Sequence, residues 1–459
     1  MSPLSNERSL PHIEKALVVG LGVSGRSVCE LMLRRGVKVM GADLRAEGEL
    51  GGELASLRDM GCRFSLGPHR LDDFLDVDLI VVSPGIPLDI EPLVAARKKG
   101  VEIVGELDWA WRQVDRPTLA VTGTNGKTTT TSLIGEVFRR AGRQVFVGGN
   151  IGTPLSQWIL NGGEAELLVL EVSSFQLDTA THFRPDVGIL LNITEDHLDR
   201  YDGFEAYADS KLSVFKRQGR EGIAIVNGDD AVCASRMAEI GSRVWSYSRR
   251  RDDGAAFVRD NHICIRVPQG PSFNLELERV ALKGVHNEEN IMAAALAAAA
   301  FQVDASVIQR EIEQYAGLPH RVEWVRTWRG IAFFDDSKAT NVGAVEKALE
   351  NFSAPVWLLL GGRDKLGSYA PLIEPMRAKG KGVIAFGEAA PRIQEALGGY
   401  LDTQTVPDLP SALNAVHGRA TSGDIVLLSP ACSSFDQYSS YAQRGDHFKE
   451  LVLELPAGA

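Results

Sequence analysis

A short strand pattern, a glycine loop and a helix pattern follow one another directly at residues 118–142 of this 459-residue chain. TLAVTG is apolar and short enough for a buried strand, and TTTTSLIGEVFRRAG, from residue 128, is typical of a helix. Between them, Gly123 and Gly126 let backbone N–H groups turn toward one point, where the helix N-terminus adds partial positive charge. Strand, loop and helix recur in this order along the chain, which predicts parallel sheets with right-handed crossovers.

The loop departs from the common phosphate-loop pattern G-x-x-x-x-G-K-[ST], because position 121 is Val. Lys127 can nevertheless reach the terminal phosphates of a nucleotide, and the Thr128 hydroxyl can ligate Mg²⁺. The alternative is a Gly-Thr turn that merely joins a strand to a helix. Burying the charge of a lysine against such a turn, without an anion to pair with it, would cost free energy. We therefore expect a nucleoside triphosphate site.

Three modules can be distinguished, in keeping with about 150 residues per domain. The first opens with KALVVGLGVSGRSVCELMLRRGVKVMGADLR (15–45), the second begins near Arg116-Pro117, and the third follows the connector GLPHR (317–321). Residues from about 240 to 280 are less regular and suggest an antiparallel excursion. We expect an α/β chain of three domains: Rossmann-like (1–107), P-loop-type central ATPase (108–317) and Rossmann-like (318–459).

The first module contains a complete Gly20-x-Gly22-x-x-Gly25 fingerprint, with Asp43 at the end of the next strand. Alone, this motif favours an NAD-dependent dehydrogenase. The fingerprint reports a backbone site for a pyrophosphate, however, and a UDP-sugar also carries a pyrophosphate and a ribose. No hydride-transfer constellation follows it, and the loop at residue 123 has no role in a dehydrogenase. A non-enzymatic nucleotide switch, the third possibility, would not need the polar loops of the third module.

Composition limits the partners. The net charge is −11, which argues against broad nucleic-acid binding. The five cysteines are scattered without C-x-x-C spacing, as in a reduced cytoplasmic protein. The N-terminus lacks the apolar core of a signal peptide, and the most apolar run, IMAAALAAAAF (291–301), is too short to span a bilayer and suits a buried helix. We expect a cytoplasmic monomer without membrane insertion.

GTNGKTT resembles the loop of the Mur ligases and the folylpolyglutamate synthetases, enzymes that hydrolyse ATP to join a carboxylate to an amine. DDSKATN and SPACSSFDQY narrow the resemblance to the Mur ligases that add D-glutamate to UDP-N-acetylmuramoyl-L-alanine through an acyl phosphate. The alternative is another Mur-type or folate-type amide ligase. Further matching segments are GLGVSG, SPGIP, GNIGTPL, LEVSSFQLD, NITEDHLDRYDGF, HNEEN and LPHRVE.

The resemblance implies a site for Mg²⁺, with two ions expected. Its ligands would be Thr128, Glu171 in LEVSSFQLD, His197 in TEDHLDR, and Lys211 in AYADSKLSVF. Lys211 is the lysine that the family carries as a carbamate, derived from CO₂. Without the resemblance, a glutamate at a strand end, such as Glu171, or a lysine on a helix, such as Lys211, is more often a surface residue. Glu195 and Asp199 fit a solvated loop. Catalytic roles are implied for Lys127, Lys211, His197 and Asn150.

The same resemblance assigns the substrates to the loops of the three modules. ATP would be bound by Gly123, Thr124, Asn125, Gly126, Lys127, Thr128, Thr129, Asn287, Asn290, Arg321 and Asp336, although Asn287 could simply cap its helix. UDP-N-acetylmuramoyl-L-alanine would be bound by Gly22, Val23, Ser24, Asp43, Arg45, Ser83, Gly85 and Asn150. D-glutamate would be bound by Lys338, Thr340, Lys365, Ser434, Phe435 and Tyr441.

Overall fold

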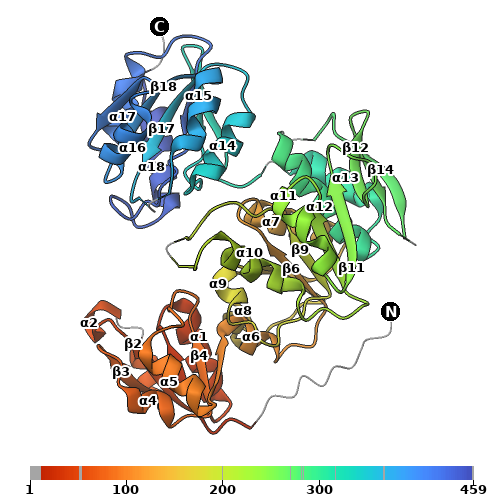
Figure 1. The fold of residues 1–459 in the computed structure, drawn as a ribbon, viewed down its shortest axis with the longest axis vertical. Coiled ribbons are helices and arrows are strands. Elements are labelled where there is room, and N and C mark those ends of the chain that lie inside the picture. The colour runs from red at the N-terminus through yellow and green to blue at the C-terminus, as the bar shows by residue number, and fades with distance from the viewer. Residues whose placement is uncertain are drawn as a thin grey trace. The chain divides into compact units, whose positions relative to one another are not determined.

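A computed structural model describes residues 12–50, 54–198, 200–268, 270–280, 282, 284–315, 317–364 and 367–456. The chain divides into two compact units. The first contains residues up to Ile193, together with 202–278 and 289–311, and the second contains residues 194–201, 279–288 and 312 onward. Three sheets are present, and helices cover both faces of each (Figure 1).

The first sheet is parallel and has the order β3-β2-β1-β4-β5. Its core is formed by apolar side chains such as Leu17, Val19 and Ile80, which pack against Phe74 and Leu93 of the covering helices. The strands are β1 (Lys15–Val19), β2 (Lys38–Asp43), β3 (Arg63–Leu66), β4 (Leu79–Val82) and β5 (Glu102–Gly105), and the helices are α1 (Val23–Arg34), α2 (Glu47–Leu50), α3 (Leu54–Asp59), α4 (Leu71–Leu75), α5 (Glu91–Lys99) and α6 (Glu106–Trp111).

The second sheet, also in the first unit, has the order β14-β13-β12-β11-β10-β9-β6-β8-β7. The strands are β6 (Thr118–Thr122), β7 (Val145–Gly149), β8 (Leu167–Glu171), β9 (Val187–Leu190), β10 (Ile223–Asn227), β11 (Arg243–Ser248), β12 (Ala256–Arg259), β13 (His262–Arg266) and β14 (Ser272–Glu276). The helices between and after these strands are α7 (Lys127–Arg140), α8 (Leu155–Leu160), α9 (Ser174–Leu177), α10 (Phe204–Leu212), α11 (Ala231–Arg236), α12 (Val285–Ala300) and α13 (Ala305–Gln314).

The third sheet lies in the second unit and has the order β15-β16-β20-β17-β18-β19, parallel except for β15. The strands are β15 (Glu323–Trp328), β16 (Ile331–Asp335), β17 (Val356–Gly361), β18 (Gly380–Phe386), β19 (Thr403–Val406) and β20 (Ile425–Leu428). The helices are α14 (Val342–Glu350), α15 (Ile373–Lys379), α16 (Ala390–Leu397), α17 (Leu409–His417) and α18 (Tyr441–Leu453).

Specific contacts join the first two sheets within the first unit. Helix α1 packs against α8, and the Ser27 hydroxyl donates to Oε1 of Gln157 at 2.8 Å. Glu106 is 2 % exposed, and its carboxylate accepts the Ser156 N–H at 2.7 Å in the first turn of α8. Burial raises the pKa of Glu106. The hydrogen bond between Glu106 and Ser156 links the start of α6 to the first turn of α8.

The antiparallel excursion proved shorter than expected. β11 and β12 continue the parallel sheet, and only the β12–β13 and β13–β14 pairs are antiparallel. The edge strand β15 was not foreseen, because its sequence EWVRTW is polar and only Trp328 is buried. Residues 291–299 are all buried in α12, as expected for the Ala-rich run.

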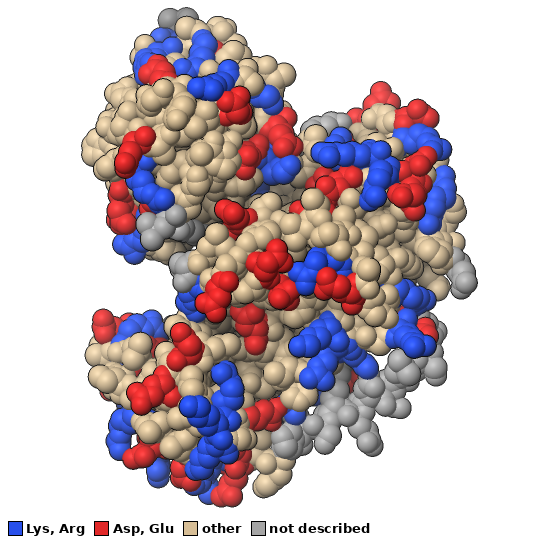
Figure 2. Space-filling view, in the orientation of Figure 1, with Lys and Arg blue, Asp and Glu red and all other residues tan. Residues whose placement is uncertain are grey.

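All five cysteines are free and buried. None of the described helices has the length and apolar character needed to cross a membrane. On the face shown in Figure 2, acidic and basic residues are interspersed over the surface.

A fully buried arginine joins the loops at the carboxyl edge of the third sheet. Arg444, on α18, is 0 % exposed and uses five N–H groups. They donate to Ser337 Oγ (3.0 Å), Ser337 O (2.8 Å), Gly361 O (3.2 Å), Cys432 O (3.1 Å) and Ser433 O (3.3 Å). Burial lowers the pKa of Arg444 to about 10. The loops after β16, β17 and β20 therefore share one anchor.

We expect Arg444→Met to destabilise the second unit by roughly 3 kcal/mol or more, because several buried acceptors lose their donors. Arg444→Lys, whose ammonium has three donors, should lose less stability. Hydrogen exchange of the β16, β17 and β20 amides measures the loss locally, with Glu450→Gln on the exposed side of α18 as the control. Unchanged exchange in Arg444→Met would show that the guanidinium does not anchor these loops.

Candidate active site

The glycine loop lies where β6 ends and α7 begins. Gly123 has φ +148° and Gly126 has φ +84°, a region that residues with a Cβ rarely adopt. A Cβ at Gly126 would lie 2.5 Å from Oδ1 of Asn290. Thr128 and Thr129, in the first turn of α7, are buried. The two glycines therefore bring backbone N–H groups of the loop and the N-terminus of α7 to one place.

Two lysines meet at this loop. Lys127 Nζ donates to the carbonyl oxygens of Gly123 and Thr124, both at 2.8 Å. Lys211 Nζ, from α10, donates to the same Gly123 oxygen at 2.9 Å. Lys211 is only 2 % exposed and lies 4.6 Å from the centre of the Tyr207 ring. Two amines beside a helix N-terminus form a strong attractor for a polyanion.

Asparagine side chains fix the shape of the loop. Asn192 Oδ1 accepts the Asn125 N–H at 2.8 Å, and Asn192 Nδ2 donates back to Asn125 O at 3.0 Å. The Thr130 hydroxyl donates to Asn290 Oδ1 at 3.1 Å, and Asn290 is 6 % exposed. Asn290 therefore packs against the loop and its helix. Asn287 lies in the other unit, at the start of α12.

Glu171 ends β8 beside β6, in register with Val121. Its Oε1 accepts from Asn150 Nδ2 at 2.9 Å, while the Asn150 N–H donates to the Glu171 carbonyl at 2.9 Å. The other carboxylate oxygen, Oε2, is buried without a hydrogen-bond partner. A buried carboxylate oxygen at the end of a strand that pairs with β6, the strand leading into the glycine loop, fits the oxygen ligands that Mg²⁺ prefers. Asn150 orients this carboxylate.

The glycine turn of the first sheet is tightly packed on one side and open on the other. A Cβ at Gly25 would lie 1.9 Å from Gly20 O, whereas one at Gly22 would meet nothing within 4 Å. The Ser83 hydroxyl donates to Gly20 O at 2.8 Å. Ser24 is half-buried, and Val23, Leu44 and Gly85 are exposed beside this turn or its neighbouring strand ends. The open side can therefore accept a ligand.

Asp43 is bound within the protein. Its Oδ2 accepts from Leu21 N (2.8 Å) and Arg45 Nη2 (2.7 Å), and its Oδ1 accepts from Arg45 N (3.0 Å) and Nε (2.9 Å). The Arg45 hydrogen bonds hold the pKa of Asp43 well below its usual range. Asp43 thus ties the glycine turn to β2, and its contact with a ribose stays a prediction.

In the second unit, Asp336 follows β16 and is 5 % exposed. Its oxygens accept from Val322 N at 3.2 Å and from the Ser429 hydroxyl at 2.7 Å. Burial raises the pKa of Asp336 to about 7. Arg321 contributes an opposing attraction that lowers it, and Arg321 Nε is itself buried without a hydrogen-bond partner. These two residues, both predicted for ATP, are therefore close enough to interact electrostatically.

The residues predicted for D-glutamate are dispersed over the same sheet edge. Lys338 Nζ lies 5.1 Å from the centre of the Tyr441 ring, and Thr340 is half-buried. Ser434 is buried, whereas Phe435 is 60 % exposed. Lys365 lies outside the described residues, as does Asp199.

A cavity of about 520 Å³ lies in the second unit. His197 is in its wall, with a backbone φ of +55° and Nε2 at 3.7 Å from Asp196 Oδ2. Asn341 Nδ2 donates to the same Asp196 oxygen at 3.1 Å. The wall also includes Glu195, Glu346, Asp364, Gly367, Ser368 and Tyr369. None of the described residues predicted for D-glutamate lines it, although Asn341 and Asp364 are sequence neighbours of Thr340 and Lys365.

The predicted metal ligands are divided between the units. Thr128, Glu171 and Lys211 belong to the first unit and His197 to the second. The ATP residues are divided likewise, with Asn287, Arg321 and Asp336 in the second unit. Sequence reasoning missed the roles of Asn192, Arg444, Asn341, Asp364 and Tyr369, whose partners lie far away along the chain.

Three family patterns match this chain in order. They are the MurD-like N-terminal domain at residues 14–105, the Mur ligase middle domain at 121–298, and the Mur ligase glutamate ligase domain at 320–432. Curated proteins called UDP-N-acetylmuramoylalanine–D-glutamate ligase are similar over nearly their whole length. The one from Geotalea daltonii is 43 % identical over 445 residues (97 % of this chain, 98 % of the relative), and the one from Desulfatibacillum aliphaticivorans is 44 % identical over 446 residues (97 % and 99 %).

Solved structures share the fold at low sequence identity. A pseudomurein peptide ligase type C from Methanothermus fervidus superposes with a TM-score of 0.62 at 18 % identity, covering 96 % of this chain and all of the other. The UDP-N-acetylmuramate–alanine ligase MurC from Thermotoga maritima gives 0.58 at 17 % identity, covering 97 % of this chain and all of the other. The chain has three α/β sheets and the three-part architecture of these enzymes, and it belongs to the Mur ligase family.

Proposed function

We propose that this protein is an ATP-dependent amide ligase that adds D-glutamate to UDP-N-acetylmuramoyl-L-alanine in cytoplasmic peptidoglycan precursor synthesis. The observation that carries the ATP chemistry is the glycine loop at the N-terminus of α7, where Lys127 Nζ donates to the Gly123 carbonyl. The substrates follow from the relatives at 42–44 % identity, all of which are called UDP-N-acetylmuramoylalanine–D-glutamate ligase.

Each sheet would serve one substrate. Residues 1–107 form a Rossmann-like domain for the UDP group, which the order β3-β2-β1-β4-β5 and the open side of the Gly20–Gly25 turn support. Residues 108–317 form a P-loop-type domain for ATP, and residues 318–459 form a Rossmann-like domain for D-glutamate. Within the last domain, the loops anchored by Arg444 carry Lys338, Thr340 and Ser434.

The reaction proceeds in two displacements. The terminal carboxylate of UDP-N-acetylmuramoyl-L-alanine attacks the γ-phosphorus of ATP, ADP leaves, and an acyl phosphate forms. Lys127 stabilises the charge on the transferring phosphoryl group. The D-glutamate amine then attacks the acyl carbon, phosphate leaves from the tetrahedral intermediate, and the amine loses a proton. The protein positions the three substrates and excludes water from the acyl phosphate.

Mg²⁺ would be held by the Glu171 carboxylate, whose Oε2 is otherwise without a partner, and by the Thr128 hydroxyl, with His197 from the second unit. The ion would neutralise the phosphate oxygens of ATP during transfer. Lys211 supports this arrangement as a carbamate, in which its amine nitrogen bonds the carbon of CO₂ and releases a proton. The burial of Lys211 beside the glycine loop, next to the Tyr207 ring, supports this proposal.

The first experiment measures phosphate release from ATP and Mg²⁺ with UDP-N-acetylmuramoyl-L-alanine. D-glutamate, L-glutamate, L-lysine or diaminopimelate is supplied in turn, and Lys127→Ala serves as the inactive control. We expect release with D-glutamate only. Release with another amine would retain the ligase reaction but refute D-glutamate, and no release with any amine would favour a folate-type ligase.

We expect Lys211→Ala to lower kcat by about 100-fold, the effect of losing several kcal/mol of charge stabilisation at a metal site. If the lysine acts as a carbamate, short carboxylates such as acetate should restore part of the activity. Lys211→Arg should not be active, although it keeps the positive charge. The exposed Lys216→Ala is the matched control. An active Lys211→Arg variant would indicate that the ammonium, and not a carbamate, is required.

Asp336 should make stability depend on pH. Its pKa is raised from 3.8 to about 7 by burial, so the folded protein binds more protons than the unfolded chain between these values. The free energy of unfolding therefore falls as pH rises from about 4 to about 7 and levels off above about pH 8. Asp336→Asn should remove this slope, which urea unfolding at about pH 5 and about pH 8 measures. The exposed Asp402→Asn variant is the control. An equal dependence of the free energy of unfolding on pH in wild type and in Asp336→Asn would contradict this prediction.

A further inference from the structure

We propose that Asn192 is a positioning residue for the phosphates of ATP, because its side-chain amide sets the direction of a peptide bond in the glycine loop. This inference rests on the proposed function, in which the glycine loop binds ATP. Asn192 lies just beyond the end of β9 and belongs, like the loop, to the first unit.

The side chain of Asn192 continues the pairing of two strands beyond their ends. β9 and β6 pair in parallel, and the Leu191 N–H then donates to Thr122 O at 3.0 Å. The Thr124 N–H donates to Asn192 O at 2.9 Å. The Asn192 amide continues from there, since its Oδ1 accepts the Asn125 N–H at 2.8 Å and its Nδ2 donates to Asn125 O at 3.0 Å. The glycine loop is thus held beside β9 by a ladder that begins as a sheet and ends as a side chain.

These two side-chain hydrogen bonds fix the direction of the N–H groups on either side of Asn125. The Asn125 N–H is used within the protein, because it points at Asn192 Oδ1. The carbonyl of the Asn125–Gly126 peptide points at Asn192 Nδ2, and in a planar trans peptide the N–H lies opposite the carbonyl. The Gly126 N–H therefore points away from Asn192. Gly126 directly precedes α7, so its N–H joins the N–H groups of the first turn as a donor to the phosphates.

The contact requires a donor and an acceptor on one side chain. The reverse orientation of the Asn192 amide would place its NH₂ group against the Asn125 N–H and its oxygen against the Asn125 carbonyl. An alanine would leave the Asn125 peptide groups without these partners, and a leucine would fill the same space without making either hydrogen bond. Replacing Asn192 by these two residues therefore separates the hydrogen bonds from the volume of the side chain.

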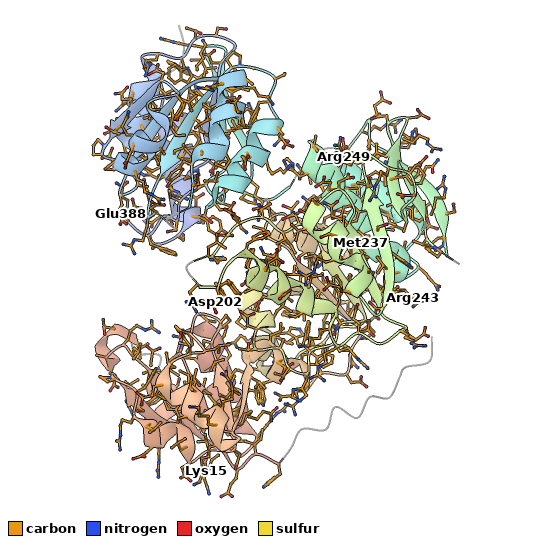
Figure 3. The ribbon with its side chains drawn as sticks, in the orientation of Figure 1. Lys15, Asp202, Met237, Arg243, Arg249 and Glu388 are labelled. Carbon is orange, nitrogen blue, oxygen red and sulfur yellow. The ribbon has the colours of Figure 1, made fainter. Side chains whose placement is uncertain are left out.

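Asn192 is itself held from its other side. The N–H of the next residue, Ile193, donates to Asp230 Oδ2 at 3.2 Å, and Asp230 Oδ1 caps α11 by accepting the Cys233 N–H at 2.9 Å. After Ile193 the chain enters the second unit, and it returns to the first at Asp202, just before α10 (Figure 3). The contacts that hold Asn192 and the loop thus lie within the first unit, so nucleotide binding alone can report on them.

Steady-state kinetics and calorimetry of Asn192→Ala test the proposal. We expect the KM for ATP and the dissociation constant of MgADP to rise about tenfold. The KM values for UDP-N-acetylmuramoyl-L-alanine and D-glutamate should stay within about twofold of wild type. Asn192→Leu should behave in the same way, because it keeps the volume but not the hydrogen bonds. Amide hydrogen exchange at Asn125 should become faster in both variants, because its N–H loses an acceptor.

Asn227→Ala is the matched control. Asn227 ends β10, which neighbours β9 in the sheet, and its Oδ1 accepts the Asp229 N–H at 2.9 Å within its own loop. This variant should lose stability but keep the KM for ATP.

An unchanged KM for ATP and unchanged MgADP binding in both Asn192 variants, or an equal rise in all three KM values, would overturn the proposal. If the wild type binds MgADP but releases no phosphate with D-glutamate, the proposed function fails. The comparison of MgADP binding between wild type and the Asn192 variants would still decide the role of Asn192.

Discussion

The carbonyl oxygen of Gly123 is the point on which the first unit's site depends. Lys127 Nζ and Lys211 Nζ both donate to it, although they come from different helices 84 residues apart in sequence number. The carbonyl is available because Gly123 adopts φ +148°, and the Asn192 amide holds the next turn of the loop in place. Without these glycine conformations the two amines could not share one acceptor, and the attraction for a polyanion at the start of α7 would be weaker.

The second unit likewise relies on a cationic side chain that donates to backbone carbonyl oxygens. One buried cation, Arg444, satisfies backbone carbonyls from three loops, so the carboxyl ends of β16, β17 and β20 form one rigid edge. Arg392 adds contacts near that edge, to Asp364 Oδ2 and to Gly367 O. In each case a guanidinium replaces hydrogen bonds that irregular backbone cannot make to itself when buried. The loops can then present polar side chains without losing their shape.

Local sequence patterns predicted much of the fold and part of the candidate site. The buried strands that lead into polar loops, the glycine turns at residues 20–25 and 123–126 and the family follow from contiguous segments, because turn chemistry and strand periodicity act over a few residues. The contacts that the sequence did not predict join residues that lie far apart along the chain. Arg444 meets Ser337 across 107 residues, Asn290 meets Thr130 across 160, and Asn150 meets Glu171 across 21. Asp43 illustrates the same limit, since its hydrogen bond from the Leu21 N–H appears only when β1 and β2 are paired.

The two units differ in the charge that they offer, and the difference matches the two halves of the proposed reaction. The first unit presents amines and a helix N-terminus, which suit the phosphates of ATP. The cavity of the second unit is lined by Asp196, Glu346 and Asp364, which suit the ammonium of an incoming amino acid. The amine must lose a proton before or as it attacks, and carboxylates that attract the ammonium would also hold it in that protonated form. Arg392 pairs with Asp364 and the Asn341 amide donates to Asp196, so two of these carboxylates already have partners within the second unit.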